Sequence, residues 1–279
     1  MPFELLQVDA FTCQPFQGNP AAVVLLGAAA PERGWLAAVA AEMNLSETAF
    51  VAPPAEAGAP WGLRWFTPRV EVDLCGHATL AAAHVLWETG RAESGAAVRF
   101  ATRSGELSAA PLGEGWIELD LPALGAAPAS APAGLLDALG LPAAAVTWTG
   151  RSRFDLLVAT VEPAVVAGLA PELGALARLD ARGVCVTAPG GADGLGGDGS
   201  SGVDFVSRFF APAVGVPEDP VTGSAHCMLG PYWAEQLGRP QLLARQVSAR
   251  GGELRVAVRG DRVGVAGQAV TVVRGVLEG

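Results

Sequence analysis

The chain has 279 residues, a net charge of −10 and a hydrophobic fraction of 51%, which predict a sizeable core in one or two domains. Nucleic acid is not expected as a partner, because the chain has no basic cluster to neutralise phosphates. All 18 basic residues are arginines. A lysine Schiff base and a Walker-type phosphate loop are therefore excluded.

The sequence also indicates where the protein works. The first residues, MPFELLQVDAF, include an acid and no basic segment, so no secretory signal is expected. No apolar run reaches membrane-spanning length without glycine, proline or charge, and no membrane contact is expected. The four cysteines (Cys13, Cys75, Cys185 and Cys227) form no CxxC pair, which argues against a disulfide framework or a metal site. A reducing cytoplasm fits this cysteine usage.

Short apolar segments predict β-strands along the whole chain. In the first half they are FELLQVDAF, AAVVLL, TAFVA, LRWFT, VRFAT, GELSAA and WIELDL. In the second half they are FDLLVAT, GVCVTA, VDFVSRFF, LLARQVSA, ELRVAVR, RVGVAG and AVTVVRG. Residues 77–87 (HATLAAAHVLW) form a helical run that is apolar nearly all round, which predicts a helix buried on all sides.

The two halves repeat one pattern. Residues 66–91 read FTPRVEVDLCGHATLAAAHVLWETGR, and residues 210–239 read FAPAVGVPEDPVTGSAHCMLGPYWAEQLGR. Both contain F-x-P-x-V-x-V, an acid, G-x-A opening a helix, and then a tryptophan, a glutamate and Gly-Arg. This order predicts two related half-domains. We expect an α+β fold in which a mixed β-sheet curls around a central buried helix, twice.

The half-domains are expected at residues 1–120 and 121–264, with a Pro/Ala/Gly-rich linker over residues 121–134. The last strands, near residues 265–279, are candidates to return to the first half. Duplicated halves could simply pack with no site between them. Each helix begins at a glycine after a polar loop, however, and helix N-termini carry N–H groups suited to a carboxylate.

The stretch VPEDPVTGSAH (residues 216–226) is interpreted as a loop that delivers Asp219 to a helix start, because Pro220 cannot sit inside a helix. Asp219 either meets a substrate there or forms an Asp-Pro turn. Ser224 is either an N-terminal cap or a ligand-binding N–H group.

Three residues of the first half could carry chemistry. Glu47 precedes an apolar strand, where a raised pKa would suit a proton shuttle; a surface or capping acid is the alternative. His77 is either a neutral hydrogen-bonding group for substrate or a buried, satisfied histidine. Cys75 is either a thiolate activated by the helix end or a small buried hydrophobe. The second half has no cysteine at the matching place, which favours the structural interpretation.

Residues 194–199 (GLGGDG) formally match the G-x-G-x-x-G pattern. A strand rather than a helix is expected after them, whereas the dinucleotide fingerprint needs a helix. We interpret the segment as a flexible surface loop.

Together these segments resemble the PhzF family, which shares its fold with diaminopimelate epimerase. The matching segments are VDAFTCQPFQGNPAAVV, NLSETAFV, RWFTPRVEVDLCGHATLAAAHVL, RFFAPAVGVPEDPVTGSAH and RGGELRVAVRGDRVGVAGQAVTV. The resemblance implies an isomerase without metal or organic cofactor, a small carboxylated substrate bound in a cleft between two similar domains, and a homodimer. The family's known substrate is trans-2,3-dihydro-3-hydroxyanthranilate.

The resemblance also assigns expected roles. Glu47 in the S-E-T segment is the implied proton shuttle, with His77 and Asp219 positioning the substrate. The implied substrate-binding residues are Asn19, Ser46, Gly76, Gly223 and Ser224. Two alternatives remain: a racemase or epimerase of an amino or hydroxy acid that uses Cys75 with a carboxylate, and a binding protein without turnover.

Overall fold

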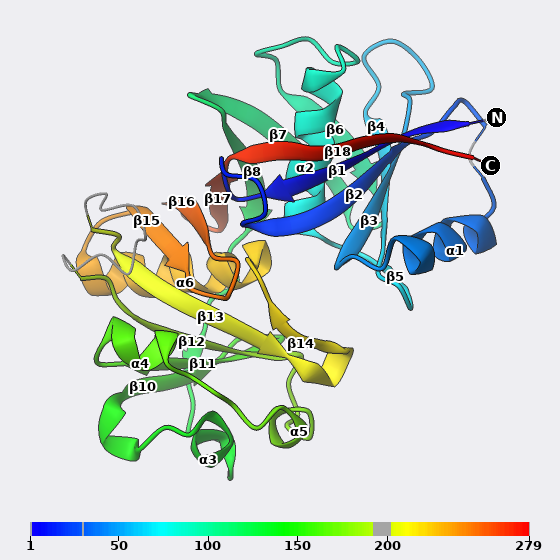
Figure 1. Cartoon of the computed structure of the whole chain (residues 1–279). Coiled ribbons are helices and arrows are strands. Elements are labelled where there is room, and N and C mark those ends of the chain that lie inside the picture. The colour runs from blue at the N-terminus through cyan, green and yellow to red at the C-terminus, as the bar shows by residue number, and fades with distance from the viewer. Residues whose placement is uncertain (1, 30, 192–201, 279) are drawn as a thin grey trace. The chain divides into compact units, whose positions relative to one another are not determined.

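The computed structural model divides the chain into two compact units (Figure 1). One comprises residues 1–121 with 266–279, and the other comprises residues 122–265. The structure describes residues 2–29, 31–191 and 202–278, so the glycine-rich segment 194–199 lies outside the described residues. No helix in the described ranges is long and apolar enough to cross a membrane.

The first unit is a mixed sheet in the order β18-β1-β2-β3-β4-β6-β7-β8. The β2/β3 and β4/β6 pairs are parallel, and the other pairs are antiparallel. A short strand, β5, forms a hairpin with β4. The strands are β1 (Phe3–Ala10), β2 (Asn19–Leu25), β3 (Glu47–Ala52), β4 (Trp61–Phe66), β5 (Glu71–Val72), β6 (Val98–Thr102), β7 (Gly105–Gly113), β8 (Trp116–Pro122) and β18 (Ala269–Leu277).

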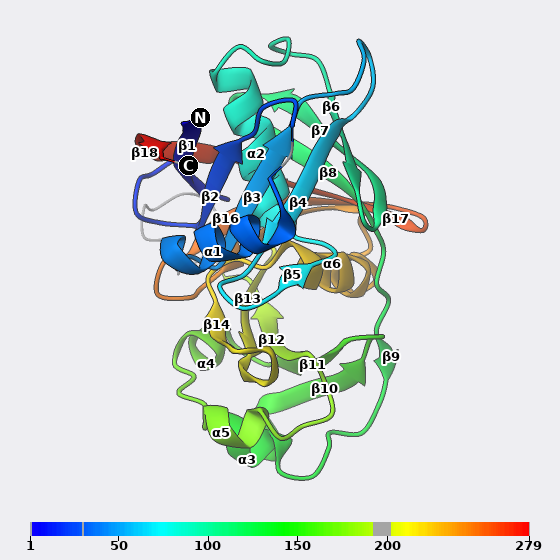
Figure 2. The same cartoon turned by 90° about the vertical axis from the view of Figure 1, so that its right-hand side faces the viewer.

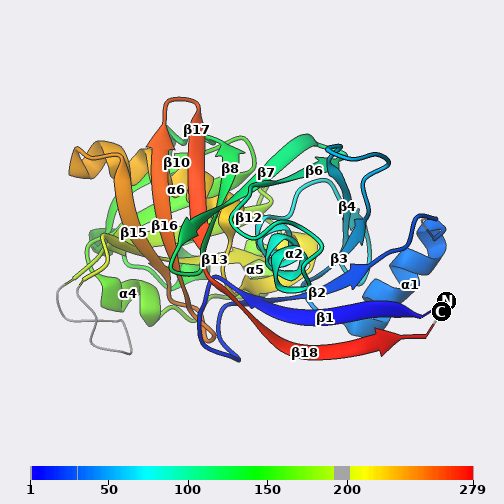
Figure 3. The ribbon, with the colours of Figure 1, turned by 90° about the horizontal axis from the view of Figure 1, so that it is seen from above.

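Helix α2 (Gly76–Glu88) lies at the centre of this unit, and the strands curve around it (Figure 3). It contacts β1, β2, β3, β7 and β18. Its side chains from His77 to Ala83 are all buried, which confirms the helix expected from the apolar run. Helix α1 (Arg33–Met43) contacts β3 and β4 through a separate small core (Figure 2).

The second unit repeats this pairing pattern. Strands β11 and β12 are parallel, as are β13 and β15, whereas β12/β13, β13/β14 and β15/β16 are antiparallel. These pairs reproduce β2/β3, β4/β6, β3/β4, β4/β5 and β6/β7 in type and order. The strands are β9 (Ala127–Pro128), β10 (Val146–Arg151), β11 (Asp155–Thr160), β12 (Gly183–Pro189), β13 (Phe205–Ala211), β14 (Val216–Asp219), β15 (Gln241–Gln246), β16 (Gly252–Arg259) and β17 (Arg262–Gly267).

Helix α6 (Gly223–Leu237) follows β14 as α2 follows β5. At Gly230 it approaches its sheet so closely that an added Cβ would lie 2.8 Å from Val256. The short helices α3 (Leu135–Leu139), α4 (Pro163–Ala167) and α5 (Leu173–Leu176) pack against the sheet of this unit and contribute to a separate hydrophobic core. The repeat predicted from the sequence is therefore present in the strand pairing as well as in the order of elements.

One local prediction was wrong. Residues 216–219, expected as a loop, form strand β14, in which Asp219 pairs with Phe209 and Val216 with Ala211. The pairing of β14 with β13 has a bulge at Pro217 and Glu218, between these two pairs, and a bulge tolerates a residue without an N–H. The strand ends at Asp219, which leaves the acid at the point where the chain turns toward α6.

Candidate active site

In the first unit, β3 and α2 bring Glu47 and His77 together. Glu47 is the first residue of β3, and His77 is the second residue of α2. The His77 Nε2 atom lies 3.2 Å from a carboxylate oxygen of Glu47. The imidazole is almost fully buried, whereas 17% of the Glu47 side chain is exposed. The Glu47 carboxylate is therefore accessible to a small molecule, although the His77 imidazole beside it is buried.

His77 is a neutral imidazole. Burial lowers its pKa to about 3, because the charged form loses its hydration. The Nε2 atom touches Glu47 but is not aligned with it for a hydrogen bond, and within the described residues it has no other hydrogen-bond partner. A buried ring nitrogen without a hydrogen bond is costly, and functional sites are where such groups are found. It is suited to bind a polar atom of a substrate.

Cys75 completes this group as the N-cap residue of α2. Its sulfur lies 3.5 Å from the Nδ1 atom of His77, and its side chain is buried. Glu47, Cys75 and His77 together offer three metal-ligand types within 4.8 Å of one another. Glu47 and Cys75, however, face opposite nitrogens of one ring, whereas a zinc ion binds a histidine through one nitrogen. The three groups are thus arranged as a chain of polar contacts rather than around a shared centre.

The remaining expected residues of the first unit lie near the same strand ends. Ser46 directly precedes β3, and Gly76 opens α2. Asn19 is the first residue of β2 and is fully buried. Because Ala21 pairs with Glu47 across the parallel strands, Asn19 and Glu47 lie at the same end of the sheet.

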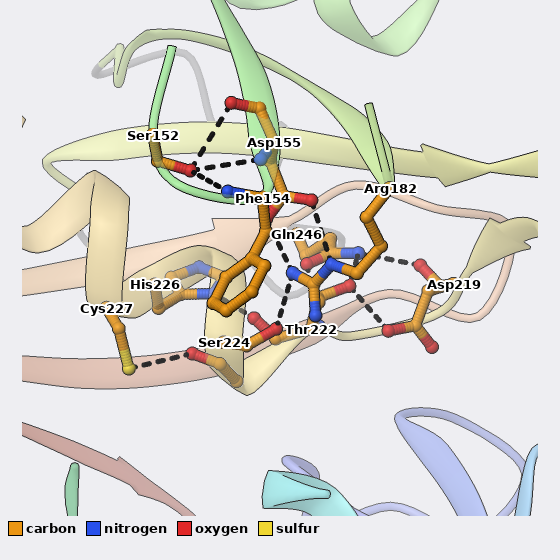
Figure 4. A network of polar contacts seen from close by, with 11 residues as sticks. Ser152, Phe154, Asp155, Arg182, Asp219, Thr222, Ser224, His226, Cys227 and Gln246 are labelled. Carbon is orange, nitrogen blue, oxygen red and sulfur yellow. Dashed lines mark hydrogen bonds and ion pairs between the residues drawn. The ribbon is translucent and has the colours of Figure 1, made fainter. Parts of the chain in front are cut away.

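In the second unit, a polar network surrounds Asp219 and the start of α6 (Figure 4). The Thr222 hydroxyl donates a hydrogen bond of 2.6 Å to the Asp219 carboxylate. The side chain of Gln246, which is fully buried, accepts a hydrogen bond from Thr222 N–H and donates one to the Asp219 carbonyl. Thr222 is the N-cap residue of α6, yet its side chain does not cap the helix. The turn is instead held by Gln246.

Gly223 and Ser224 are the first two residues of α6. The Ser224 hydroxyl accepts a hydrogen bond of 3.1 Å from Arg182. Arg182 in turn donates two hydrogen bonds to the buried carboxylate of Asp155, at 2.9 and 2.5 Å (Figure 4). Its guanidinium also lies over the ring of Phe209. The Arg182 guanidinium is therefore held beside the start of α6, where the helix dipole also favours an anion.

Sequence reasoning missed Arg182, Asp155 and Gln246. Arg182 and Asp155 come from different segments, and no local pattern links them. Gln246 could have been identified from the sequence, because it occupies an inward position in the alternating strand β15, where Leu242 and Ala244 are also buried. A polar residue at an inward position calls for a hydrogen-bonding partner.

The sequence matches the family described as "Phenazine biosynthesis-like protein" over residues 8–275. An uncharacterized isomerase of Halalkalibacterium halodurans is 48% identical over 268 residues, which cover 96% of this chain and 95% of that protein. The human phenazine biosynthesis-like domain-containing protein is 39% identical, and the match covers 99% of both chains.

Solved structures agree with this match. The crystal structure of a PhzF family protein from Enterococcus faecalis is 38% identical and superposes with a TM-score of 0.89 over the whole of both chains. A hydroxyproline epimerase from Agrobacterium vitis, 12% identical, superposes with a TM-score of 0.59 over 99% of this chain and 91% of that one, which shows a shared fold alone. The fold is therefore the α+β type common to PhzF proteins and such epimerases. Within it, the chain belongs to the PhzF (phenazine biosynthesis-like) family.

Proposed function

We propose that the protein is a cofactor-independent isomerase that moves a proton within a small carboxylated substrate, in the manner of a trans-2,3-dihydro-3-hydroxyanthranilate isomerase. The observation that carries the proposal is the contact between Glu47, which solvent still reaches, and the neutral, buried His77. Family membership and the isomerase names of similar proteins support the same reaction class.

Glu47 acts as both base and acid. Its carboxylate takes a proton from one carbon as that C–H bond breaks, and the electron pair moves into the adjacent unsaturated system. The resulting carboxylic acid returns the proton to a second carbon, so that a double bond shifts and Glu47 regains its charge. Correct positioning and general acid–base catalysis each supply part of the rate, the latter typically about 10²–10⁴-fold.

The other expected residues bind the substrate. His77 is neutral and holds a polar group of the substrate through Nε2. Asp219 binds a second polar group, and the N–H groups of Gly223 and Ser224 hold the carboxylate at the positive end of α6. Asn19, Ser46 and Gly76 complete the binding set. The chain has no lysine, so a Schiff base plays no part in the reaction.

Proton NMR in D2O with trans-2,3-dihydro-3-hydroxyanthranilate tests the reaction. We expect the double bond to move, with the proton carried by Glu47 reappearing at the second carbon. Any deuterium at that carbon reports exchange of the Glu47 carboxylic acid with solvent before the proton is returned. Exchange of an α-proton in an amino or hydroxy acid, with no movement of a double bond, would instead support the racemase or epimerase that uses Cys75. Saturable binding with no change in any ligand would support a binding protein. Either result would overturn the proposal.

A further inference from the structure

The imidazole of His77 is held between two acidic side chains, one at each ring nitrogen. The sulfur of Cys75 lies 3.5 Å from Nδ1, and a carboxylate oxygen of Glu47 lies 3.2 Å from Nε2. These are the only side-chain polar contacts of the ring within the described ranges of the chain. Because the ring is buried, water does not compete for either nitrogen. The two contacts therefore decide where the ring carries its proton.

A neutral imidazole has one N–H group and one bare nitrogen, and its partners select between the two tautomers. If Nδ1 is bare, it accepts a hydrogen bond from the Cys75 thiol, and Nε2–H faces the Glu47 carboxylate. If Nδ1 carries the proton, it meets sulfur, a weak acceptor, while the lone pair of Nε2 faces a negatively charged oxygen. The first arrangement has two favourable contacts and the second has one weak and one repulsive contact.

The backbone keeps the thiol in this place. Cys75 is extended, with φ −147° and ψ 109°, and α2 begins at the next residue. Its carbonyl accepts a hydrogen bond of 2.6 Å from the Thr79 hydroxyl, one turn into the helix. Cys75 and His77 are therefore two residues apart on a fixed helix start, and the sulfur is buried beside Nδ1.

We propose that Cys75 is a positioning residue that fixes the tautomer of His77: its thiol donates to Nδ1, so that Nε2 carries the proton and donates a hydrogen bond to substrate. The importance for catalysis rests on the proposed function, in which His77 binds the substrate. The assignment gives Cys75 a role that needs neither a thiolate nor a second cysteine, and it predicts that a hydroxyl can replace the thiol.

Nitrogen-15 NMR of histidine-labelled protein at pH 7 tests the proposal directly, because ring nitrogen shifts distinguish an N–H from a bare nitrogen. The chain has only three histidines, and a His84→Gln variant removes the signals of the partly buried His84. His226 differs from His77 because its Nδ1 contacts the Thr222 carbonyl at 2.8 Å and therefore carries the proton. We expect the opposite tautomer, Nε2–H, for His77.

Two substitutions at Cys75 separate its possible roles. Cys75→Ser keeps a donor at Nδ1 and is expected to keep the Nε2–H tautomer and kcat/KM within about threefold. Cys75→Ala removes the donor and is expected to give a mixture of tautomers and to lower kcat/KM about tenfold or more, the usual cost of removing a group that orients a functional histidine. Cys185→Ala, a buried cysteine of the other unit, controls for lost volume and should leave the His77 signals unchanged.

Three results would overturn the proposal: an Nδ1–H tautomer in the unchanged protein, an Nε2–H tautomer and full rate in Cys75→Ala, or an inactive Cys75→Ser with the Nε2–H tautomer intact. The last would show that the thiol itself reacts. The tautomer is measured without substrate. If the protein fails to turn over the proposed substrate, the proposed function is refuted, but the tautomer of His77 still tests the role of Cys75. Melting temperatures of the variants identify any that fail to fold.

Discussion

The buried side chain of Gln246 donates a hydrogen bond of 2.6 Å to the Asp219 carbonyl. Its oxygen accepts a second bond, of 2.9 Å, from the N–H of Thr222. One amide thus spans the turn between β14 and α6. Since the Thr222 N–H is buried, it depends on this side chain for its hydrogen bond, whereas the Asp219 carbonyl is only partly buried.

We expect Gln246→Leu to leave the buried Thr222 N–H unsatisfied, at a cost of about 1–3 kcal/mol, and to remove one hydrogen bond from the Asp219 carbonyl. Chemical denaturation should show the protein destabilised by about 2 kcal/mol or more. Substrate binding should also be weaker, because the turn carries Asp219, for which we propose a substrate-binding role. Gln241→Leu is the matched control, since Gln241 is exposed on the same strand. Equal stability of the two variants would contradict the role given to Gln246.

Asp155 is expected to matter for substrate binding through Arg182 and Ser224. Asp155→Asn replaces a carboxylate, 1% exposed, that accepts two hydrogen bonds from Arg182. Because about a third of the Arg182 side chain is exposed, solvent screens the loss, and we expect a destabilisation of about 1–3 kcal/mol.

The kinetic signature of Asp155→Asn should be a raised KM with a smaller change in kcat, since Arg182 contacts Ser224 rather than the proton-transferring group. The control is Asp180→Asn, which breaks the exposed pair with Arg151 in the same unit. That variant should be far less destabilised, because the Asp180 side chain is fully exposed and solvent screens the pair. An unchanged KM in Asp155→Asn would refute the link to the substrate site.

The lowered pKa of Glu71 predicts that the folded protein loses stability in acid. Its side chain is 2% exposed and contacts Arg64, Arg33 and Arg103 at 2.8, 2.9 and 3.3 Å. The hydrogen bond from Arg64 is the largest cause that lowers the pKa of Glu71, to about 2. A carboxyl with a lowered folded-state pKa stabilises the protein above its unfolded pKa and loses that effect as the pH falls toward the folded value.

The stabilisation by Glu71 should therefore be complete above about pH 4.5 and disappear between about pH 4.5 and 2. Its size is expected to be about 1–2 kcal/mol, because the three arginines are partly exposed to solvent. Melting temperatures across pH should show a smaller difference between the unchanged protein and Glu71→Gln at pH 3 than at pH 7. A difference independent of pH would mean that the charge of Glu71 is not what stabilises the fold.

Gly18→Ala should disturb the turn that presents Asn19. Gly18 has a φ of +64°, and an added Cβ would collide with the backbone carbonyl oxygen of Ala10. Because that oxygen belongs to the neighbouring strand, it cannot move aside as a side-chain end could. We expect a loss of about 2 kcal/mol or more in the free energy of unfolding. Gly27→Ala, where no atom lies within 4 Å, is the control.

Much of the fold could be predicted because it depends on local pattern and on the repeat. The apolar run after Gly76 predicted α2, and the matching order of residues after Phe66 and Phe210 predicted two related half-domains, each with a central helix. Hydrophobic periodicity is a local pattern, and a duplication repeats that pattern. Both features can therefore be recognised in a single sequence. The strand β14 was missed because its formation depends on pairing with β13 rather than on its own composition.

The candidate site was less predictable. Glu47, His77 and Asp219 could be selected from motifs, but the contact of His77 with both Cys75 and Glu47 requires the fold. Arg182 reaches Ser224 from a segment 42 residues away in the chain. Such contacts depend on tertiary packing, and they cannot be predicted from the spacing of residues along the chain.

The most direct test of the account is the rate at which Glu47→Gln moves the double bond of trans-2,3-dihydro-3-hydroxyanthranilate, measured by proton NMR in D2O. The amide keeps the size of Glu47 but cannot take a proton from carbon. We predict a rate at least about 10³-fold below that of the unchanged protein, with ligand binding retained. Glu42→Gln, an exposed glutamate in α1, should react at the full rate. Full turnover by Glu47→Gln would contradict the central claim that Glu47 carries the proton.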